Sequence, residues 1–323
     1  MVLAISFQQM YNAQRRRYSV LAMFGQVLIL LTFCVVGFVL CKTKLANPDH
    51  SKVLSVMLVY ILFPLMSFNT FSAQFTVSYL QEKGLLLIVS AVLIVVVVIL
   101  SKIFSKFLGG DPYEKNVNEY SMSIGNIGYM GYPLAEAMYG TAGMLDCMMF
   151  GLPMTIYINT VGYNMLTAGK GEKSLLKQIF TPSMYGILAG CLVGITGLKV
   201  PELVTEIAQM GGNCVAPISM MLTGMAISQF NIKELLCNRK VYIICAVRLA
   251  LMPVLVWAMV KLTGLTFALM PALMLYAMPC GMNTIVFPKL VDKDCRLGAA
   301  TVMISTVISM LTIPLWLYLL LPH

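Results

Sequence analysis

A long apolar run is interrupted by Ser123-Ile-Gly-Asn-Ile-Gly-Tyr-Met-Gly-Tyr-Pro133-Leu, which holds four helix breakers within nine residues. Each glycine costs a helix about 1 kcal/mol relative to alanine and a proline about 3 kcal/mol, so no continuous helix is expected there. A second apolar run carries a similar interruption, Ala277-Met-Pro279-Cys-Gly281-Met-Asn283-Thr-Ile-Val-Phe-Pro288. Non-helical backbone at membrane depth survives only where it lines a cavity or is buried in protein. The pair of interruptions therefore predicts a transporter's substrate site.

The composition around these stretches is that of an all-α integral membrane protein. Of the 323 residues 59% are hydrophobic and 11% are charged, whereas about a quarter of the residues of a soluble domain are charged. The net charge of +9 is scattered between apolar runs, so it indicates membrane orientation and not nucleic-acid binding. Two histidines and nine cysteines without CxxC spacing favour neither a metal site nor a disulfide framework, and no hydrolase motif or phosphate loop is present. We expect no enzyme and no cofactor.

Ten runs are long enough to cross a bilayer. They are Ser19–Cys41, Val53–Phe71, Gly84–Leu100, Asn116–Tyr139, Met144–Thr167, Phe180–Leu198, Leu203–Ser228, Val241–Val260, Phe267–Phe287 and Leu297–Leu321. Residues 1–18 precede the first run and are expected to form a separate interfacial segment. The fourth and ninth spans contain the two interruptions, which we expect near the membrane midplane.

Lysines and arginines orient the ten spans. The loops after the odd-numbered spans hold fifteen of them, against six on the opposite side. The richer side is expected to be cytoplasmic, which places both termini of this multi-pass plasma-membrane protein outside. Arg15, Arg16 and Arg17 argue locally for the reverse, and we let the count over the whole chain decide.

The chain also carries a weak internal repeat. A shift of 153 residues superimposes Pro48 on Pro201 and Pro64 on Pro217, and it aligns the span boundaries approximately. We therefore predict two five-helix repeats, residues 19–167 and 178–323, joined by a short cytoplasmic linker, residues 168–177. Because five is odd, the second repeat enters the membrane inverted, as in many secondary transporters. The alternative is that the chain forms two tandem helical bundles, which share only the glycines and prolines that commonly interrupt or end helices.

The interruptions supply the candidate substrate-binding residues. A half-helix that begins near Pro133 directs free amides and a partial positive charge at the gap, which suits an anion. Asn126 and Asn283 add neutral hydrogen-bonding groups. The predicted substrate-binding set is Asn126, Gly128, Tyr129, Gly131, Pro133, Pro279, Gly281, Asn283 and Thr284. The alternative is that glycine and proline are simply common in membrane helices and that the asparagines join helices together.

Three ionisable side chains inside or near the spans are further candidates. Glu136 and Asp146 could carry a coupling proton or only cap helix ends. Arg248 lies seven residues into the eighth span, where it could compensate the substrate's charge or extend its stem to the cytoplasmic interface. We expect the second, and therefore no neutralisation of the substrate by Arg248.

With these residues in hand, the chain resembles the auxin efflux carrier (PIN-like) family over nearly its whole length. The motifs that carry the resemblance are Asn126 followed by Pro133 and Met-Tyr-Gly140, Ala-Met-Pro279-Cys-Gly281, Phe63-Pro64-Leu65 and Ala216-Pro217-Ile218. The resemblance implies that spans one, two, six and seven form a dimerising scaffold and that the other six move against it. It also implies that Asn126 is the family's site asparagine and that the substrate is a carboxylate such as malate or malonate. The short loop between spans five and six favours a bacterial carrier over a hormone carrier.

The sequence thus predicts a secondary active transporter or uniporter of small organic anions in the bacterial inner membrane. Its expected partners are the anion, the lipid bilayer and a second copy of the chain, with Na⁺ or H⁺ as candidate coupling ions. Two alternatives stay open: a membrane receptor or sensor that binds such a ligand without moving it, and a carrier similar to the bile-acid:sodium symporters.

Overall fold

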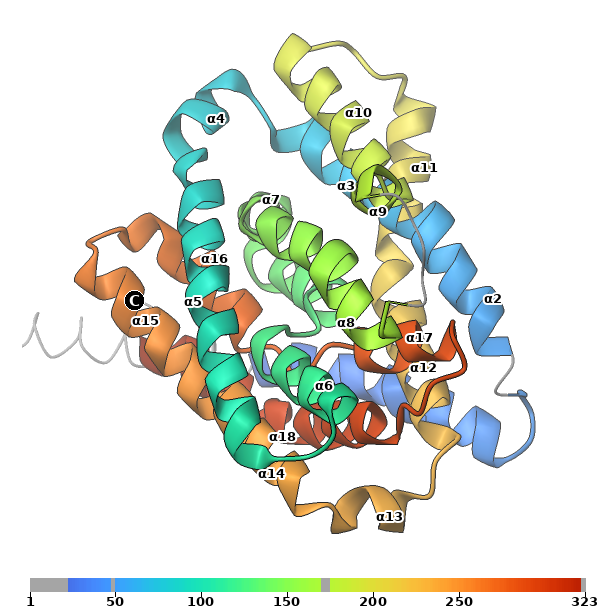
Figure 1. Cartoon of the computed structure of the whole chain (residues 1–323). Coiled ribbons are helices and arrows are strands. Elements are labelled where there is room, and N and C mark those ends of the chain that lie inside the picture. The colour runs from blue at the N-terminus through green and yellow to red at the C-terminus, as the bar shows by residue number, and fades with distance from the viewer. Residues whose placement is uncertain (1–22, 48–49, 170–174, 321–323) are drawn as a thin grey trace, which may run out of the picture.

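The computed structural model describes residues 23–47, 50–169 and 175–320, and this part of the chain is helical (Figure 1). Residues 1–18, the predicted interfacial segment, lie outside it, as do residues 170–174 of the predicted linker. Seven helical segments in the described residues are long and apolar enough to cross a membrane. They are Met23–Lys42, His50–Gln74, Leu85–Leu108, Ile127–Thr167, Glu202–Ser228, Arg239–Leu262 and Arg296–Leu320. The predicted all-helical class is confirmed, and these helices are typical of a multi-pass membrane protein.

After the helix Met23–Lys42, the elements follow one another with few connecting residues. They are α2 (His50–Met57), η1 (Leu58–Leu62), α3 (Phe63–Gln74), α4 (Val77–Lys83), α5 (Leu85–Leu108), α6 (Pro112–Ser123), η2 (Ile127–Gly131), α7 (Tyr132–Tyr157), η3 (Ile158–Gly162), α8 (Tyr163–Thr167), α9 (Leu175–Ile179), α10 (Pro182–Thr196), α11 (Glu202–Asn213), α12 (Val215–Ser228), α13 (Ile232–Cys237), α14 (Arg239–Ala246), η4 (Val247–Leu251), α15 (Met252–Leu262), η5 (Thr266–Ala268), α16 (Leu269–Tyr276), α17 (Asn283–Lys289) and α18 (Arg296–Leu320). The segments η1 to η4 are π-helical.

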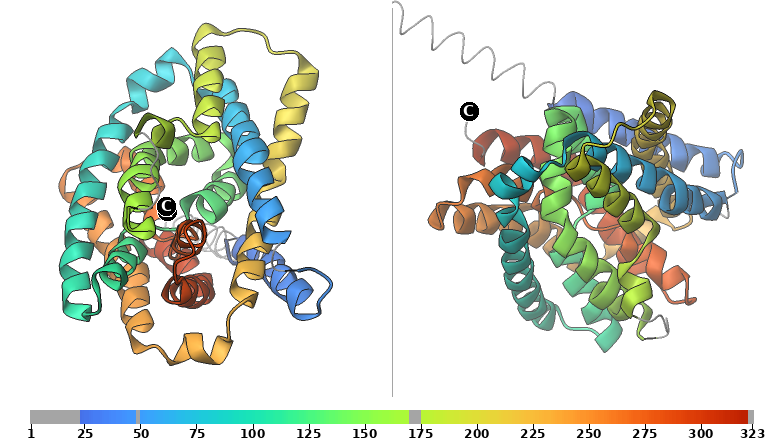
Figure 2. Two further views of the ribbon diagram at one scale, coloured as in Figure 1. Left: turned by 45° about the vertical axis from the view of Figure 1, so that its right-hand side comes forward. Right: turned by 90° about the horizontal axis from the view of Figure 1, so that it is seen from above.

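The helices form two groups (Figures 1 and 2). The first holds Met23–Lys42, α2, η1, α3 and α10 to α12, and the second holds α5 to α8 and α14 to α18. Within the first group α10 lies directly on α3: a Cβ added at Gly186 would stand 2.3 Å from the Pro64 carbonyl oxygen, and one at Gly194 would stand 2.2 Å from that of Phe75. Small residues let membrane helices approach this closely.

Three of the π-helical segments have a common cause in the sequence. Pro64, Pro133 and Pro253 each stand second in the α-helix that follows η1, η2 and η4. A proline inside a helix lacks the amide hydrogen and clashes with the carbonyl four residues earlier. One extra residue in the preceding turn relieves this clash, and such π-turns are frequent at functional sites.

Side chains of other helices satisfy carbonyls that these prolines release. Tyr129 lies four residues before Pro133, and the Ser219 hydroxyl of α12 donates to its carbonyl oxygen at 2.7 Å. Leu249 lies four residues before Pro253, and the Trp316 indole of α18 donates to its carbonyl oxygen at 2.5 Å. These two carbonyls are thus satisfied where the helices are irregular, as an apolar environment requires.

Both predicted interruptions are present. The helix α6 ends at Ser123 and η2 begins at Ile127, with extended backbone at Ile124. In the ninth predicted span, α16 ends at Tyr276 and α17 begins at Asn283. A third break lies between the predicted fourth and fifth spans, which end at Tyr139 and begin at Met144: Gly140 has φ 69° and ψ −174° inside α7, so the 41-residue segment Ile127–Thr167 is kinked there.

Candidate functional site

The two interrupted segments cross each other in an antiparallel arrangement. The Asn126 amide donates to the Pro279 carbonyl at 2.8 Å, and the Gly281 amide donates to the Ile124 carbonyl at 3.2 Å. These bonds form an isolated β-bridge between Gly125 and Cys280. Segments more than 150 residues apart in the sequence therefore satisfy each other's backbone where neither is helical.

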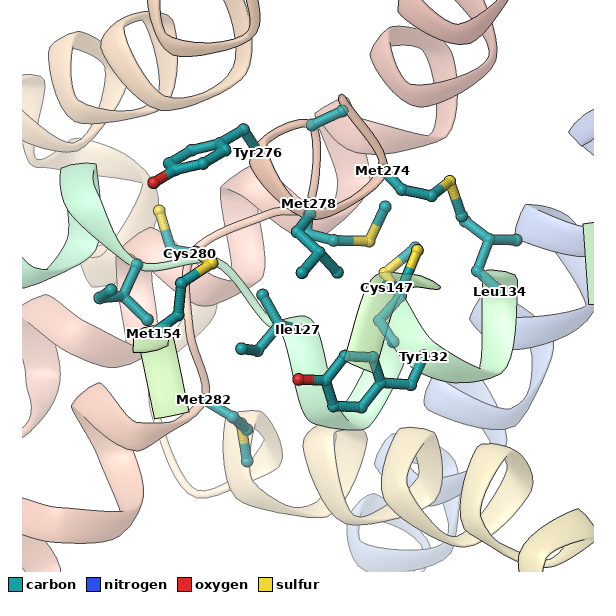
Figure 3. Packing of buried hydrophobic residues seen from close by; sticks show 14 of the residues in the cluster. Ile127, Tyr132, Leu134, Cys147, Met154, Met274, Tyr276, Met278, Cys280 and Met282 are labelled. Atoms are coloured by element: carbon teal, nitrogen blue, oxygen red, sulfur yellow. The ribbon is translucent and has the colours of Figure 1, made fainter. Parts of the chain in front are cut away.

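The side chains around this crossing are largely methionine and other soft apolar groups (Figure 3). Met278, Cys280 and Met282 follow one another along the extended segment between α16 and α17, and Ile127 lies beside them at the start of η2. All four are almost completely buried. Methionine adapts to irregular gaps, which suits an interface between non-helical segments.

A cavity of about 230 Å³ lies against the crossing. Five of the nine predicted substrate-binding residues line it, namely Asn126, Gly128, Tyr129, Gly281 and Asn283. None of its lining residues carries a formal charge. The cavity is also bordered by η1, α3 and α10, so it lies between the two helix groups.

Asn126 is the most unusual group in this cavity. Its side chain is 2% exposed, and neither Oδ1 nor Nδ2 has a hydrogen-bond partner among the described residues. In the same part of the chain, the backbone amides of Gly128 and Tyr129 at the start of η2 have no acceptor. Asn283 differs, because its Nδ2 donates to the Tyr120 hydroxyl at 3.0 Å. Burying an amide without partners is costly, so a ligand that supplies them would bind favourably.

The other four predicted residues support the crossing without lining the cavity. The Thr284 hydroxyl donates to the Gly281 carbonyl at 2.9 Å, and Pro279 accepts from the Asn126 amide. Gly131 allows close packing, since a Cβ there would stand 3.3 Å from Leu275. Pro133 stands second in α7, as a helix-starting proline does.

A wider cavity of about 780 Å³, lined in part by exposed side chains, adjoins the site. The two cavities share five lining residues, Val59, Asn159, Thr181, Val286 and Phe287. The exposed side chains of Lys52 and Lys177 border the wider one. Both lysines belong to the side that the charge count predicts to be cytoplasmic, and cationic groups at a cavity entrance attract anions.

Arg248 corrects one of our expectations. Its side chain does not extend to the membrane interface but is fully buried at the crossing. The guanidinium donates to backbone carbonyls of Met278, Leu275 and Ser123 at 2.9 to 3.0 Å. Residues 275–278 are far from Arg248 in the sequence, so local position alone suggested the wrong environment.

The two candidate carboxylates lie away from the cavity lining. The Asp146 carboxylate pairs with Lys83 at 2.5 Å and accepts from the Tyr79 hydroxyl at 2.8 Å, so it joins α7 to α4. Glu136 is half-buried on α7. Neither borders the site, and an ion-paired structural role accounts for Asp146.

Comparison with known proteins identifies the family of the chain. The family model described as "Membrane transport protein", that of the auxin efflux carrier family, matches residues 22–317. The chain belongs to this family. The predicted resemblance is therefore confirmed, and the chain is a membrane transporter and not an enzyme.

Three relatives are similar over most of their length. An uncharacterized transporter of Methanocaldococcus jannaschii is 29% identical over 307 residues, which is 91% of this chain and 98% of the relative. An uncharacterized transporter of Methanothermobacter thermautotrophicus is 18% identical, covering 90% of this chain and 96% of the relative. A Rhizobium meliloti protein named "Putative malonate transporter" is 24% identical, covering 64% of this chain and 68% of the relative.

This membrane transporter also has cavity residues that the sequence analysis missed. Ser67 of α3 and Ser183 of α10 share a hydrogen bond at 3.0 Å beside the cavity, and Thr181 caps the start of α10. The sequence Thr181-Pro-Ser is a recognisable helix start. Its position opposite the crossing follows only from the packing of α10 on α3, which a local pattern does not show.

Proposed function

We propose that this transporter carries small organic anions by alternating access and that it binds them at the crossing of the two interrupted helices. The observation that carries the proposal is the buried Asn126 side chain, which lines a cavity and whose polar atoms have no hydrogen-bond partner within the described part of the chain. The unpaired amides of Gly128 and Tyr129 lie next to it at a positive helix end. A carboxylate accepts hydrogen bonds, so it suits the Asn126 Nδ2 group and these two amides, whereas the Asn126 Oδ1 atom would require a donor from the ligand or from water.

The chemistry of the cavity favours a small anion with an apolar part. Side chains such as Phe63, Met66 and Ile158 form much of its wall, and its polar groups lie on two sides, at the crossing and at the start of α10. Most ligand pockets combine apolar walls with a few polar groups in this way. The name of the Rhizobium meliloti relative makes malonate the first substrate to test.

Alternating access finds support in the position of the cavity between the two helix groups. The first group contributes Phe63, Met66 and Ser183, and the second contributes the crossing itself. A rigid-body shift of one group against the other would close the wider cavity and open the opposite side. Such rocking around a fixed site is the common mode of transporters built from repeats.

We further propose the ten-span inverted repeat that the sequence predicts. A straight helix the length of Ile127–Thr167 would measure about 60 Å, roughly twice the hydrocarbon core of a bilayer. The kink at Gly140 would let this segment cross twice. The two shorter apolar helices, Pro182–Thr196 and Thr266–Tyr276, would supply a further crossing each, the second together with α17.

The decisive experiment replaces Asn126 with alanine and compares it with Asn118→Ala. Asn118 is a matched control, because its side chain is also fully buried and unpartnered but does not line the cavity. Binding of malonate and related carboxylates is measured by thermal shift, and the flux of the same anions is measured in proteoliposomes. We expect Asn126→Ala to abolish both and Asn118→Ala to retain both. Equal behaviour of the two variants would move the site elsewhere.

The same measurements separate the alternatives that the sequence left open. A receptor or sensor would bind the anion without any flux into proteoliposomes. A carrier of the bile-acid:sodium-symporter type would show binding and flux that depend on Na⁺ when Na⁺ is exchanged for choline. Transport of the anion in choline would argue against Na⁺ coupling and for a carrier that is uncoupled, driven by the membrane potential or coupled to H⁺.

A further inference from the structure

Arg248 is a fully buried cation that has no acidic partner in the part of the chain that the structure describes. Among the described residues the ion pairs are Lys83–Asp146, Lys240–Glu114 and Arg296–Asp294, and none involves Arg248. Its guanidinium instead donates to four backbone carbonyls: Nε to Met278 at 2.9 Å, Nη1 to Ser123 at 3.0 Å and to Met122 at 3.5 Å, and Nη2 to Leu275 at 3.0 Å. A buried charge in a membrane protein pairs with other charges or with backbone carbonyls, and it marks function by default.

Three of these carbonyls belong to the C-terminal ends of the two interrupted half-helices, and that of Met278 lies two residues beyond the end of α16. Ser123 is the last residue of α6, and Leu275 is the last but one of α16. Each helix C-terminus carries about −0.5 of an elementary charge, so the two ends together carry roughly −1. One guanidinium therefore neutralises both ends at the point where they meet.

The neutralisation matters because these ends lie beside the proposed anion site. Gly125 separates them from the cavity: it lines the cavity on one side, and a Cβ added to it would stand 2.0 Å from Arg248 Nη2. Without a cation there, the negative ends of α6 and α16 would oppose the positive start of η2 and repel an anion near Asn126. With Arg248 in place, only the positive helix start acts on the cavity.

We propose that Arg248 is a built-in cation at the crossing, which gives the site its affinity for anions and makes an inorganic cation unnecessary there. The inference rests on the proposed function, because it assigns a role to Arg248 at that anion site. Arg248 acts as a positioning residue, since the Gly125 backbone stands between it and the cavity. Arg248 belongs to the second helix group. If this group moves through the membrane field during transport, Arg248 adds one positive charge to the charge that moves.

The first test measures malonate binding by the full-length protein in detergent, in NaCl and in choline chloride. We expect the wild type to bind equally in both salts. Arg248→Ala should bind at least tenfold more weakly in choline, and millimolar guanidinium or Na⁺ should restore binding, because the three close carbonyl oxygens can hold a cation in the vacated space. Arg239→Ala is the matched control: Arg239 is exposed at the start of α14, and its loss should leave binding unchanged.

Several results would overturn the proposal. They are a wild type that needs Na⁺ to bind malonate, a folded Arg248→Ala that binds in choline as the wild type does, and a loss of binding that neither cation restores. If Arg248→Ala does not elute as a folded species, Arg248→Lys and Arg248→Gln replace it. The lysine variant should then keep affinity within about tenfold of the wild type and the glutamine variant should not; equal affinities would refute the role of the charge.

A second readout separates an electrostatic role from a structural one. Wild-type protein on a supported membrane should show a transient charge movement after a voltage or substrate step, and in Arg248→Gln the charge that moves should change by up to one elementary unit. An unchanged charge movement in a folded variant would contradict the proposal. The proposed function fails in a different way: the wild type would then bind no carboxylate, and Asn126→Ala would behave like the wild type.

Discussion

Arg248 can occupy its buried position only because residue 125 is a glycine and has no side chain. A methyl group at Gly125 would stand 2.0 Å from Arg248 Nη2, whereas one at Gly128 would stand 3.7 Å from Phe63, an ordinary contact. We therefore expect Gly125→Ala to lower the free energy of unfolding by about 1–3 kcal/mol, the usual cost of overpacking. Gly128→Ala should change it little. Thermal melting followed by tryptophan fluorescence checks both, and equal melting temperatures would show that Arg248 can move aside.

Asn126 also allows a prediction about stability. Its buried amide has no partner in residues 23–47, 50–169 and 175–320, so its removal costs no hydrogen bond within this part of the protein. We expect Asn126→Ala to melt at the same temperature as the wild type or higher, although it abolishes binding, because binding sites often retain groups that disfavour folding. A clearly lower melting temperature would indicate that the amide holds the crossing together and is not kept for a ligand.

At the scale of single residues, the sequence predicts features whose signal is local. Asn126 stands among glycines and before a proline, and this pattern alone pointed to an exposed backbone end beside a polar side chain. Arg248 was interpreted wrongly, because its partners Ser123 and Leu275 lie on two other segments that only the crossing brings together. A long cationic side chain fits either an interface or a buried cage, and the choice depends on tertiary contacts.

At the scale of elements, the irregular helices depend on donors from their neighbours. Ser219 donates to the Tyr129 carbonyl that Pro133 leaves free, and this is a bond between the two helix groups. We expect Ser219→Ala to cost about 0.6–1.7 kcal/mol, the range found for hydrogen bonds between membrane helices. The control is Ser228→Ala on the same helix, whose hydroxyl bonds only to Met225 of its own helix. Thermal melting of the two variants compares them, and an equal effect would mean that the Tyr129 carbonyl finds another donor.

The two interruptions themselves were predictable, and their mutual arrangement was not. Glycine and proline break a helix through local sterics, so the runs at 123–134 and 277–288 could be identified from the chain alone. The partners of the freed backbone groups could not be identified in this way, because the Asn126 amide donates to the Pro279 carbonyl, which is more than 150 residues away in the sequence. The π-turns before Pro64 and Pro253 escaped prediction for a related reason: proline indicates a strained turn but does not say whether a kink or an extra residue relieves it.

At the scale of the whole molecule, composition was sufficient for the membrane class and the helical fold. The charge asymmetry among the loops gave an orientation, and Lys52 and Lys177 on the predicted cytoplasmic side border the wide cavity. If the orientation is right, this conformation is open to the cytoplasm. The grouping of helices into two bodies depends on close contacts such as α3 on α10, where glycines meet backbone, and no period in the sequence reveals which helices they join.

The orientation can be tested with a cysteine that the chain already has. Cys237 is exposed at the end of α13, in the predicted cytoplasmic loop that also holds Lys233 and Arg239. In a Cys214→Ser background, which removes another exposed thiol, a membrane-impermeant maleimide should leave Cys237 unlabelled in intact cells and label it in inside-out vesicles. Glu82→Cys, on the exposed surface of α4 near the opposite end, should show the reverse pattern. Labelling of Cys237 from outside would mean that the N-terminal arginines set the topology against the loop count, and the wide cavity with its lysines would then face the exterior.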